Sequence, residues 1–251
     1  MNIVNLLQLN EGERVAAMMT TTDFADNKYF ICITKNGIVK RTNLSEYKNI
    51  RKRGLRAITV AEDDEIVSAF LTEGDCTVLI ASRNGMAIRF DETKARPLGR
   101  SARGVRAIKL REGDFVVGAT KIFDDQATIL TVTDKGMGRR CAISSYREQN
   151  RGGLGLKNYP ISDEKGYVCG IRTLGPDDDV ILISTDGVII RFRANDLRIM
   201  GRPASGVRVM RLAEDSKVAS FTRTAHDEDE ETTEIEKVSD EEIAASLSEE
   251  A

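Results

Sequence analysis

Cationic side chains recur at fixed positions along this sequence, and the chemistry they could perform is the neutralisation of phosphate. In four similar segments an arginine stands four residues after a glycine: Arg41, Arg89, Arg140 and Arg191. Further cations lie in loops that read glycine, branched aliphatic residue, cation: Arg53, Arg56, Arg100, Arg103, Arg106, Arg151, Lys157, Arg202 and Arg208. Glycine beside a cation lets backbone N–H groups approach a phosphate while the side chain neutralises its charge. We therefore predict that these residues form a surface for a polyanion, with Lys40 and Arg139 extending the first set.

The charge of the chain is divided between a basic body and an acidic tail. The 251 residues carry 37 Lys plus Arg and 40 Asp plus Glu, a net charge of −3. Residues 226–251 hold twelve acidic residues and one basic residue, which leaves a net charge of +8 on residues 1–225. This asymmetry favours a polyanion as the partner. We interpret the tail either as a solubilising terminus or as an intramolecular competitor for the basic surface.

Residues that could carry catalysis or hold a metal do not converge in this sequence. His226 is the only histidine, which excludes multi-histidine sites and His-based triads. The four cysteines are far apart without a CxxC pair, which is typical of reduced, buried cysteines in the cytoplasm. No phosphate loop for ATP is present, and no apolar run approaches the roughly 20 residues of a membrane span. We predict no catalytic residue, no metal and no cofactor, and we interpret acidic runs such as 62–65 as solvated turns.

Four repeated hairpins must position the first set of arginines. Segments that begin at Tyr29, Thr77, Thr128 and Asp179 each read an apolar β-branched run, a turn pair, a glycine and a second short run. The turn glycines are 48, 51 and 51 residues apart, and Asn-Gly turns are strong hairpin signals. A position fixed relative to a hairpin tip points to the same side in every repeat. The four arginines are therefore expected to form a row along one rim.

Each repeat continues with the glycine–aliphatic–cation loop and then an acidic turn that leads into another apolar strand. The loop glycines are 50, 51 and 51 residues apart. This period, with several short strands per repeat, predicts an all-β, propeller-like array of blades. We place the blades at 28–75, 76–126, 127–178 and 179–225, a partial unit at 1–27 and an acidic disordered tail at 226–251. Because the chain starts inside a repeat, we interpret it as an N-terminally incomplete fragment.

One loop carries a recognisable motif. Residues Gln149, Asn150, Arg151, Gly152, Gly153, Leu154 and Gly155 resemble the Gln-Arg-Arg-Gly-Gly-Lys-Gly box in the C-terminal DNA-wrapping domain of the DNA gyrase A subunit. The likeness extends over residues 1–225 through the hairpins and the loops Gly99–Arg106 and Gly201–Arg208. Asn150 and Leu154 stand where the box has cations, and the family's principal box lies in its first blade. We therefore interpret this loop as a secondary, degenerate box.

The resemblance implies a six-bladed β-pinwheel, a propeller variant whose neighbouring blades exchange strands, with double-stranded DNA wrapped around the basic perimeter. It implies a non-catalytic module of a bacterial type II topoisomerase that supports ATP-dependent negative supercoiling. The implied partners are the A subunit's N-terminal domain and the gyrase B subunit, in a heterotetramer located in the cytoplasm and associated with the nucleoid. The family's DNA-breaking tyrosine belongs to that N-terminal domain, so no tyrosine here is assigned the role; Tyr146 is expected to pack.

Two other interpretations remain open. The C-terminal domain of the topoisomerase IV A subunit looks similar but generally lacks the box, so the surviving motif favours gyrase. A propeller that binds a protein partner is expected to show an apolar or aromatic rim. This sequence has no Trp and only 5% aromatic residues, which favours the nucleic-acid interpretation.

Overall fold

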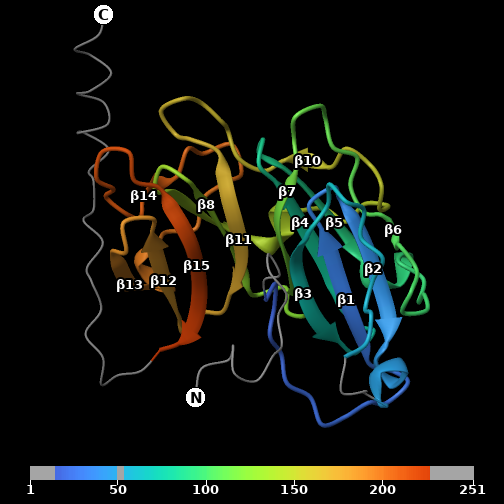
Figure 1. Ribbon diagram of the computed structural model, residues 1–251. Helices are drawn as coiled ribbons and strands as arrows, with labels where there is room; N and C mark the ends of the chain where they lie inside the picture. The colour runs from blue at the N-terminus through green and yellow to red at the C-terminus, as the bar shows by residue number, and fades with distance from the viewer. Residues whose placement is uncertain (1–14, 50–53, 227–251) are drawn as a thin grey trace, which may run out of the picture.

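The computed structural model describes residues 15–49 and 54–226, and these residues form four antiparallel sheets (Figure 1). The first sheet has the order β3-β1-β2-β6, the second β10-β5-β4-β7, the third β11-β8-β9-β14 and the fourth β13-β12-β15. The strands are β1 Tyr29–Thr34, β2 Ile38–Asn43, β3 Ile66–Thr72, β4 Thr77–Ser82, β5 Met86–Asp91, β6 Val105–Arg106, β7 Val116–Ile122, β8 Thr128–Thr133, β9 Met137–Ala142, β10 Leu156–Lys157, β11 Val168–Leu174, β12 Asp178–Ser184, β13 Ile189–Arg193, β14 Val207–Arg208 and β15 Val218–Ala225. Short 3-10 turns follow β2, β5, β9 and β13, at Leu44–Tyr47, Glu92–Lys94, Ile143–Ser145 and Ala194–Asp196. The predicted all-β array of blades is confirmed.

The hairpins form where the turn glycines predict them. In the first blade β1 pairs with β2 up to Ile33 opposite Val39, on either side of Gly37. Gly37 has a φ of 80° and Gly85 a φ of 79°, conformations that glycine adopts without a steric penalty. β-Branched residues in the flanking strands favour the extended backbone, so each hairpin is specified locally.

Apolar clusters fill the space between neighbouring blades. Ile31 of the first blade and Ile80 of the second belong to one cluster, while Leu79 belongs to the cluster between the second and third blades. Leu79 and Ile80 are consecutive, and successive side chains of a strand point to opposite faces of its sheet. Both faces of an interior blade are therefore buried, which explains why these strands read as continuous apolar runs.

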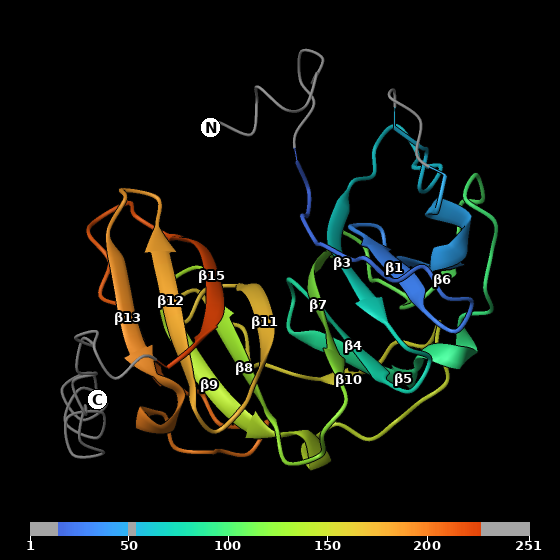
Figure 2. The same ribbon diagram turned by 90° about the horizontal axis from the view of Figure 1, so that it is seen from below.

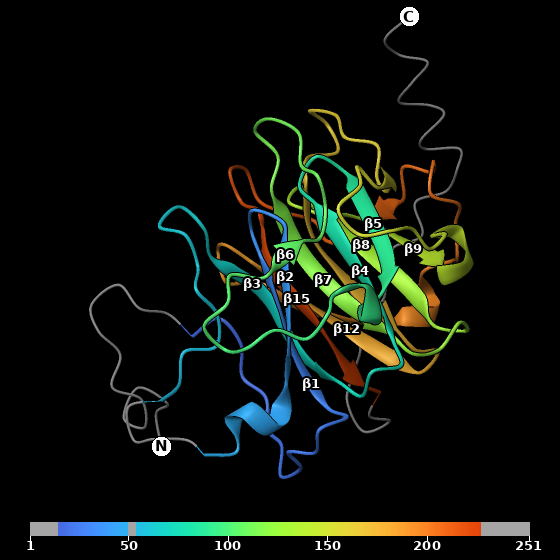
Figure 3. The ribbon, with the colours of Figure 1, turned by 90° about the vertical axis from the view of Figure 1, so that its right-hand side faces the viewer.

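Strands are exchanged between successive blades. The short strand β6 comes from the loop of the second repeat but pairs with β2 of the first blade, as Figure 3 shows. In the same way β10 of the third repeat pairs with β5, and β14 of the fourth pairs with β9. This topology is that of a β-pinwheel, as the resemblance implies.

The four blades follow one another around an arc (Figure 2). The strands at the inner edge of each sheet contact the next in order: β3 with β7, β7 with β11, and β11 with β15. The exchanged strands β6, β10 and β14 lie at the opposite edge of their sheets. Strand exchange therefore places the glycine–aliphatic–cation loops along the outer perimeter of the arc. The predicted partial unit lies mostly outside the described residues, and so does the acidic tail beyond His226.

Candidate nucleic-acid interface

Each exchanged strand presents one exposed cation at the same structural position. Arg106 in β6 lies opposite Ile38, Lys157 in β10 lies opposite Met86, and Arg208 in β14 lies opposite Met137. All three cations are exposed. Their strands β6, β10 and β14, which Figure 1 labels, lie at the outer edge of successive sheets. The three charges therefore follow one another around the perimeter. We call Arg106, Lys157 and Arg208 the perimeter cations.

The glycines that stand two residues before the perimeter cations lie where neighbouring blades touch. A Cβ added to Gly155 would lie 2.3 Å from the carbonyl oxygen of Ala87, and one added to Gly206 would lie 2.2 Å from that of Gly138. Both glycines also have positive φ, 77° and 83°. The neighbouring blade's backbone therefore occupies the space that the sequence pattern suggested for an approaching phosphate. The glycines act on the interface indirectly, by allowing the cation-bearing strand to join its neighbour.

The repeated arginine in the second strand of each hairpin is buried in the first three blades. The exposed fractions of Arg41, Arg89 and Arg140 are 4%, 9% and 6%, and the side chain of Arg191 is 15% exposed. The prediction that these arginines form a solvent-facing row is therefore wrong for Arg41, Arg89 and Arg140. The sequence pattern showed that these arginines recur. It could not show that the next loop covers the side of the sheet on which they lie.

The buried guanidinium groups bind partners within the chain. Arg140 donates from Nε to Thr128 Oγ1 at 2.7 Å and from Nη1 to the carbonyl oxygen of Ala194 at 2.8 Å. Burial lowers the pKa of Arg140. Arg41 Nε lies 3.0 Å from the carboxylate of Glu92, which is also buried. Ion pairing and hydrogen bonding offset the cost of removing these charges from water.

The same arginines hold the cation loops through their backbone. The carbonyl oxygens of Arg41, Arg89 and Arg140 each accept a hydrogen bond of 2.8 Å from the loop of the following repeat. The donors are the amides of Leu98, Gln149 and Met200. We conclude that the repeated arginine marks the junction of a blade with the next loop.

Lys40 and Arg139, which the sequence places beside that row, are also buried. Lys40 donates from Nζ to the carbonyl oxygens of Ala57, at 2.6 Å, and of Arg100. Arg139 donates to the carbonyl oxygens of two residues in the last loop, Arg202 and Ala204. Both cations fasten loops instead of facing solvent, so their predicted place on the rim is wrong. Burial lowers the pKa of Lys40.

The box-like loop Gln149–Gly155 lies over the junction between the first two blades. Arg151 donates from Nε to the carbonyl oxygen of Lys94 at 2.8 Å and from Nη1 to that of Arg106 at 2.9 Å. Arg202, at the equivalent position of the next repeat, donates from Nη1 to the carbonyl oxygen of Lys157. Each of these half-buried arginines thus clamps the backbone of the preceding perimeter cation.

Other residues of the box-like loop reach solvent or the neighbouring backbone. Gly152 donates its amide to the carbonyl oxygen of Ala107 at 2.6 Å, and Asn150 and Leu154 are exposed. Tyr146, just before the loop, is buried with its hydroxyl donating to Asn158 Oδ1 at 2.7 Å, so the prediction that it packs is confirmed. Burial raises its pKa to about 12.

The remaining predicted contacts fall on the same loops. Arg56 and Arg103 are exposed, Arg100 is half-buried, and Arg53 lies outside the described residues. Sequence reasoning missed a further set of exposed arginines at the start of the loops: Arg96, Arg147 and Arg198. They are spaced by 51 residues, like the loop glycines, so the same repeat comparison could have found them.

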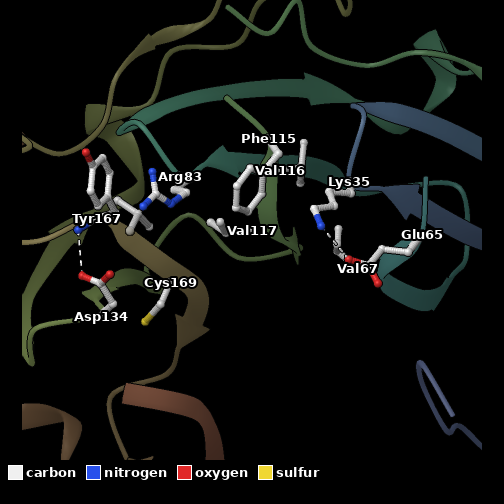
Figure 4. Close-up of a pocket in the computed structure, with 11 residues that line it drawn as sticks. Lys35, Glu65, Val67, Arg83, Phe115, Val116, Val117, Asp134, Tyr167 and Cys169 are labelled. Atoms are coloured by element: carbon white, nitrogen blue, oxygen red, sulfur yellow. Dashed lines mark hydrogen bonds and ion pairs between the residues drawn. The ribbon is translucent and has the colours of Figure 1, made fainter. Parts of the chain in front are cut away.

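A cavity of about 320 Å³ lies at the inner edge of the blades, and Figure 4 shows residues that line it. None of the perimeter cations is among its lining residues. The guanidinium of Arg83 stacks on the ring of Tyr167 at 3.4 Å, and Lys35 forms an ion pair of 2.9 Å with Glu65. These cations have partners within the wall of the cavity.

In the described part of the chain, no group of three or more His, Cys, Asp or Glu residues could hold a metal. Residues 15–49 and 54–226 also contain no helix that could span a membrane.

Comparison with known proteins identifies the relatives of this array. A curated relative, the DNA gyrase A subunit of Haloquadratum walsbyi, is 39% identical over 222 residues, covering 86% of this chain and 26% of that protein. The DNA gyrase A subunit of Staphylococcus aureus (strain NCTC 8325 / PS 47) is 38% identical over 237 residues, covering 94% and 27%. The chain thus spans about a quarter of the length of these relatives.

Solved structures show the same architecture. A crystal structure of the C-terminal domain of DNA topoisomerase IV superposes with a TM-score of 0.84 at 25% identity, covering 100% of this chain and 75% of that one. A structure of the DNA gyrase A C-terminal domain gives a TM-score of 0.80 at 27% identity, covering 89% and 74%. The family model of the DNA gyrase C-terminal domain, a β-propeller, matches residues 28–73, 77–122, 127–173 and 178–225. With a match to every blade of the array, the chain belongs to the DNA gyrase A C-terminal domain family.

Proposed function

We propose that this chain is a non-catalytic module that binds and wraps double-stranded DNA for a DNA gyrase A subunit. In this role it supports the ATP-dependent negative supercoiling performed by the whole type II topoisomerase. The proposed partners in that enzyme are the A subunit's N-terminal domain and the gyrase B subunit, in a heterotetramer. The proposed location is the cytoplasm, in association with the nucleoid.

The observation that carries this proposal is the alignment of the perimeter cations. Arg106, Lys157 and Arg208 occupy equivalent positions at the outer edge of three successive blades. A curved row of exposed cations suits a curved phosphate backbone, because each contact releases condensed counterions. Where the structure describes the loops, they contain no recognition helix, so we expect phosphate contacts and DNA deformability to dominate over base readout.

The contact surface that we propose is revised from the sequence prediction. It consists of the perimeter cations and the exposed loop arginines Arg56 and Arg103, with the arginines at the loop starts added. Arg41, Arg89 and Arg140 are buried with partners of their own, so we assign them a positioning role for the loops. The half-buried Arg100, Arg151, Arg191 and Arg202 complete the set.

A topoisomerase IV module is the nearest alternative function. The topoisomerase IV domain superposes well, but the curated relatives at 38–39% identity are gyrase A subunits. This identity favours gyrase. A protein-binding propeller is less favoured, because the perimeter strands present cations at their exposed position.

Mobility shift and topology assays test the proposal directly. The purified chain is titrated onto linear duplex DNA at low salt and onto relaxed circular DNA in the presence of topoisomerase I. We expect binding that weakens steeply with salt, together with a change in linking number. Absence of binding at low salt would refute the DNA-binding proposal, and binding without a linking-number change would refute wrapping by this chain alone.

The acidic tail offers a second measurement. Its residues 227–251 lie outside the described residues, so competition of the tail with DNA for the perimeter stays a prediction. Truncation after Thr224 removes a net charge of −11 and should tighten DNA binding, most strongly at low salt. Equal affinities of the truncated and full chains across a salt series would contradict competition.

A further inference from the structure

The fourth blade differs from the other three by one strand. The first three sheets have four strands, whereas the fourth has the order β13-β12-β15. In the first three blades the outer hairpin strand is covered by an exchanged strand from the following repeat. Within the described residues, no strand pairs with the outer edge of β13, at the left of Figure 1.

Side-chain exposure also shows that the outer edge of β13 is uncovered among the described residues. Ile189 stands two residues after its turn glycine, as do Val39 in the first blade and Ala87 in the second. The exposed fraction is 63% for Ile189 but 0% for Val39 and Ala87. Val188 beside it is 48% exposed. Ile189 therefore faces solvent at a position that the first two blades bury, and Val188 adds a second exposed aliphatic side chain beside it.

The turn glycine of the fourth blade also lacks the backbone contacts that the other turn glycines receive from an exchanged strand. The carbonyl oxygen of Gly37 accepts the amide of Ala107 at 2.8 Å, and that of Gly136 accepts the amide of Val209 at 2.8 Å. For Gly187 no such backbone donor exists among the described residues. A Cβ added to Gly187 meets nothing within 4 Å, whereas one added to Gly136 would lie 2.2 Å from Met210 O.

The three internal junctions define what fits this edge. Each occupant supplies a glycine, then a branched aliphatic residue, then an exposed cation, and it runs antiparallel to the strand it joins. The aliphatic residue packs against an apolar cluster, as Val105 and Val207 do. The two residues after the cation donate their amides to the turn glycine. Five consecutive residues therefore make these strand and turn contacts.

We propose that the outer edge of β13 binds an extended segment of another polypeptide that carries a glycine–branched aliphatic–cation sequence. The segment adds to the sheet as an antiparallel fourth strand, with main-chain hydrogen bonds giving affinity and the aliphatic side chain giving specificity. Unprotected edge strands pair readily, and the first two residues of β13, Ile189 and Ile190, bear neither charge nor proline.

The copy of this sequence in the first repeat, which forms none of the internal junctions, does not cover the edge. Gly54, Leu55 and Arg56 have the pattern, but Thr59 Oγ1 just beyond them donates to Ser101 O at 2.7 Å and holds the segment on the first blade. The first and fourth blades lie at opposite ends of the arc (Figure 2). Residues 1–14, 50–53 and 227–251, which lie outside the described part of the chain, contain no glycine–branched aliphatic–cation sequence. We therefore assign the occupant to another polypeptide, and because five residues suffice, it need not be a folded blade.

A synthetic peptide of residues 201–212 serves as the probe. It is labelled with a fluorophore and titrated with the purified chain, while hydrogen exchange reports protection of the amides in β13. We expect saturable binding that Ile189→Lys weakens by about tenfold or more, because the variant loses the burial of an aliphatic side chain. Phe123→Lys, at a residue 54% exposed beyond β7, is the matched control and should bind normally. Circular dichroism confirms that both variants fold.

A second peptide tests the geometry of the junction. The Gly206→Ala version of the probe places a Cβ where Gly138 O lies 2.2 Å away in the internal junction, so it should bind at least about tenfold more weakly. Equal binding of the two peptides, or equal binding to Ile189→Lys and the parent chain, would overturn the proposal. So would protection of β13 that rises with protein concentration in the absence of peptide, since it would assign the edge to a second copy.

Discussion

Removal of the perimeter cations gives the sharpest measurement on the proposed DNA surface. The variant combines Arg106→Ala, Lys157→Ala and Arg208→Ala, three exposed residues at equivalent positions of successive blades. Each phosphate contact contributes a slope of about −0.9 to the dependence of log affinity on log salt. Loss of three contacts should therefore flatten the slope by about 2.7. Between about 50 and 200 mM salt, these contacts account for about a 40-fold loss of affinity in the parent chain.

The assay is a fluorescence anisotropy titration of a labelled DNA duplex at several salt concentrations. A matched control removes the same charge elsewhere: Lys135→Ala, Lys217→Ala and Arg223→Ala, exposed cations at a hairpin turn and on or beside the inner strand β15. This control should leave the slope within about one unit of the parent value. Equal flattening in both variants would refute the perimeter as the contact surface, because it would show that net charge alone governs binding.

Three further predictions concern the stability of the blades. Arg140→Ala removes a buried, hydrogen-bonded cation and should lower the free energy of unfolding in urea by about 3 kcal/mol, whereas Arg147→Ala at an exposed arginine should change it by less than about 0.5 kcal/mol; equal effects would contradict the burial. Gly155→Ala should cost about 3 kcal/mol, because its Cβ would lie 2.3 Å from Ala87 O, while Gly113→Ala, also at positive φ but with nothing within 4 Å, should cost only about 1 kcal/mol; similar losses would argue against tight strand exchange. Burial acts to raise the pKa of Asp179, but hydrogen bonds from His226 and Arg191 outweigh it and lower that pKa. The stabilisation is therefore present above the unfolded pKa of about 3.9 and is lost as pH falls through the folded value. The Asp179→Asn variant should thus be less stable than the parent chain at neutral pH and should lose less stability on acidification below about pH 4. Parallel curves of stability against pH for the two proteins would exclude this linkage.

Local features of the sequence were sufficient to predict the blades. The glycines Gly37 and Gly85 predicted their hairpins because positive φ at a tight turn is a property of a few adjacent residues. The repeat period predicted four blades, because each repeat carries its own hairpin signal. The exposed state of Arg106, Lys157 and Arg208 also agrees with the predicted surface, although the sequence could not show that each belongs to its neighbour's sheet.

The burial of Arg41 and Arg140 could not be predicted, because it depends on residues about 50 positions away. The next repeat's loop pairs with the arginine backbone and covers its side chain. A repeat comparison shows that a residue recurs, but an arginine that recurs to fasten a loop has the same sequence signature as one that recurs to contact a phosphate. Only the partners of its guanidinium group distinguish the two.

The hairpins, the period, the all-β class and the division of charge could all be read from the sequence, since each is set by neighbouring residues or by composition. Three features became clear only from the folded arrangement: which cations face solvent, why glycine precedes the perimeter cations, and which hairpin strand has no exchanged strand at its outer edge among the described residues. These depend on strand exchange, which brings the backbone of one repeat within van der Waals distance of the next. The open edge of β13 is the clearest case, because nothing in its own five residues distinguishes it from the covered strands β2, β5 and β9.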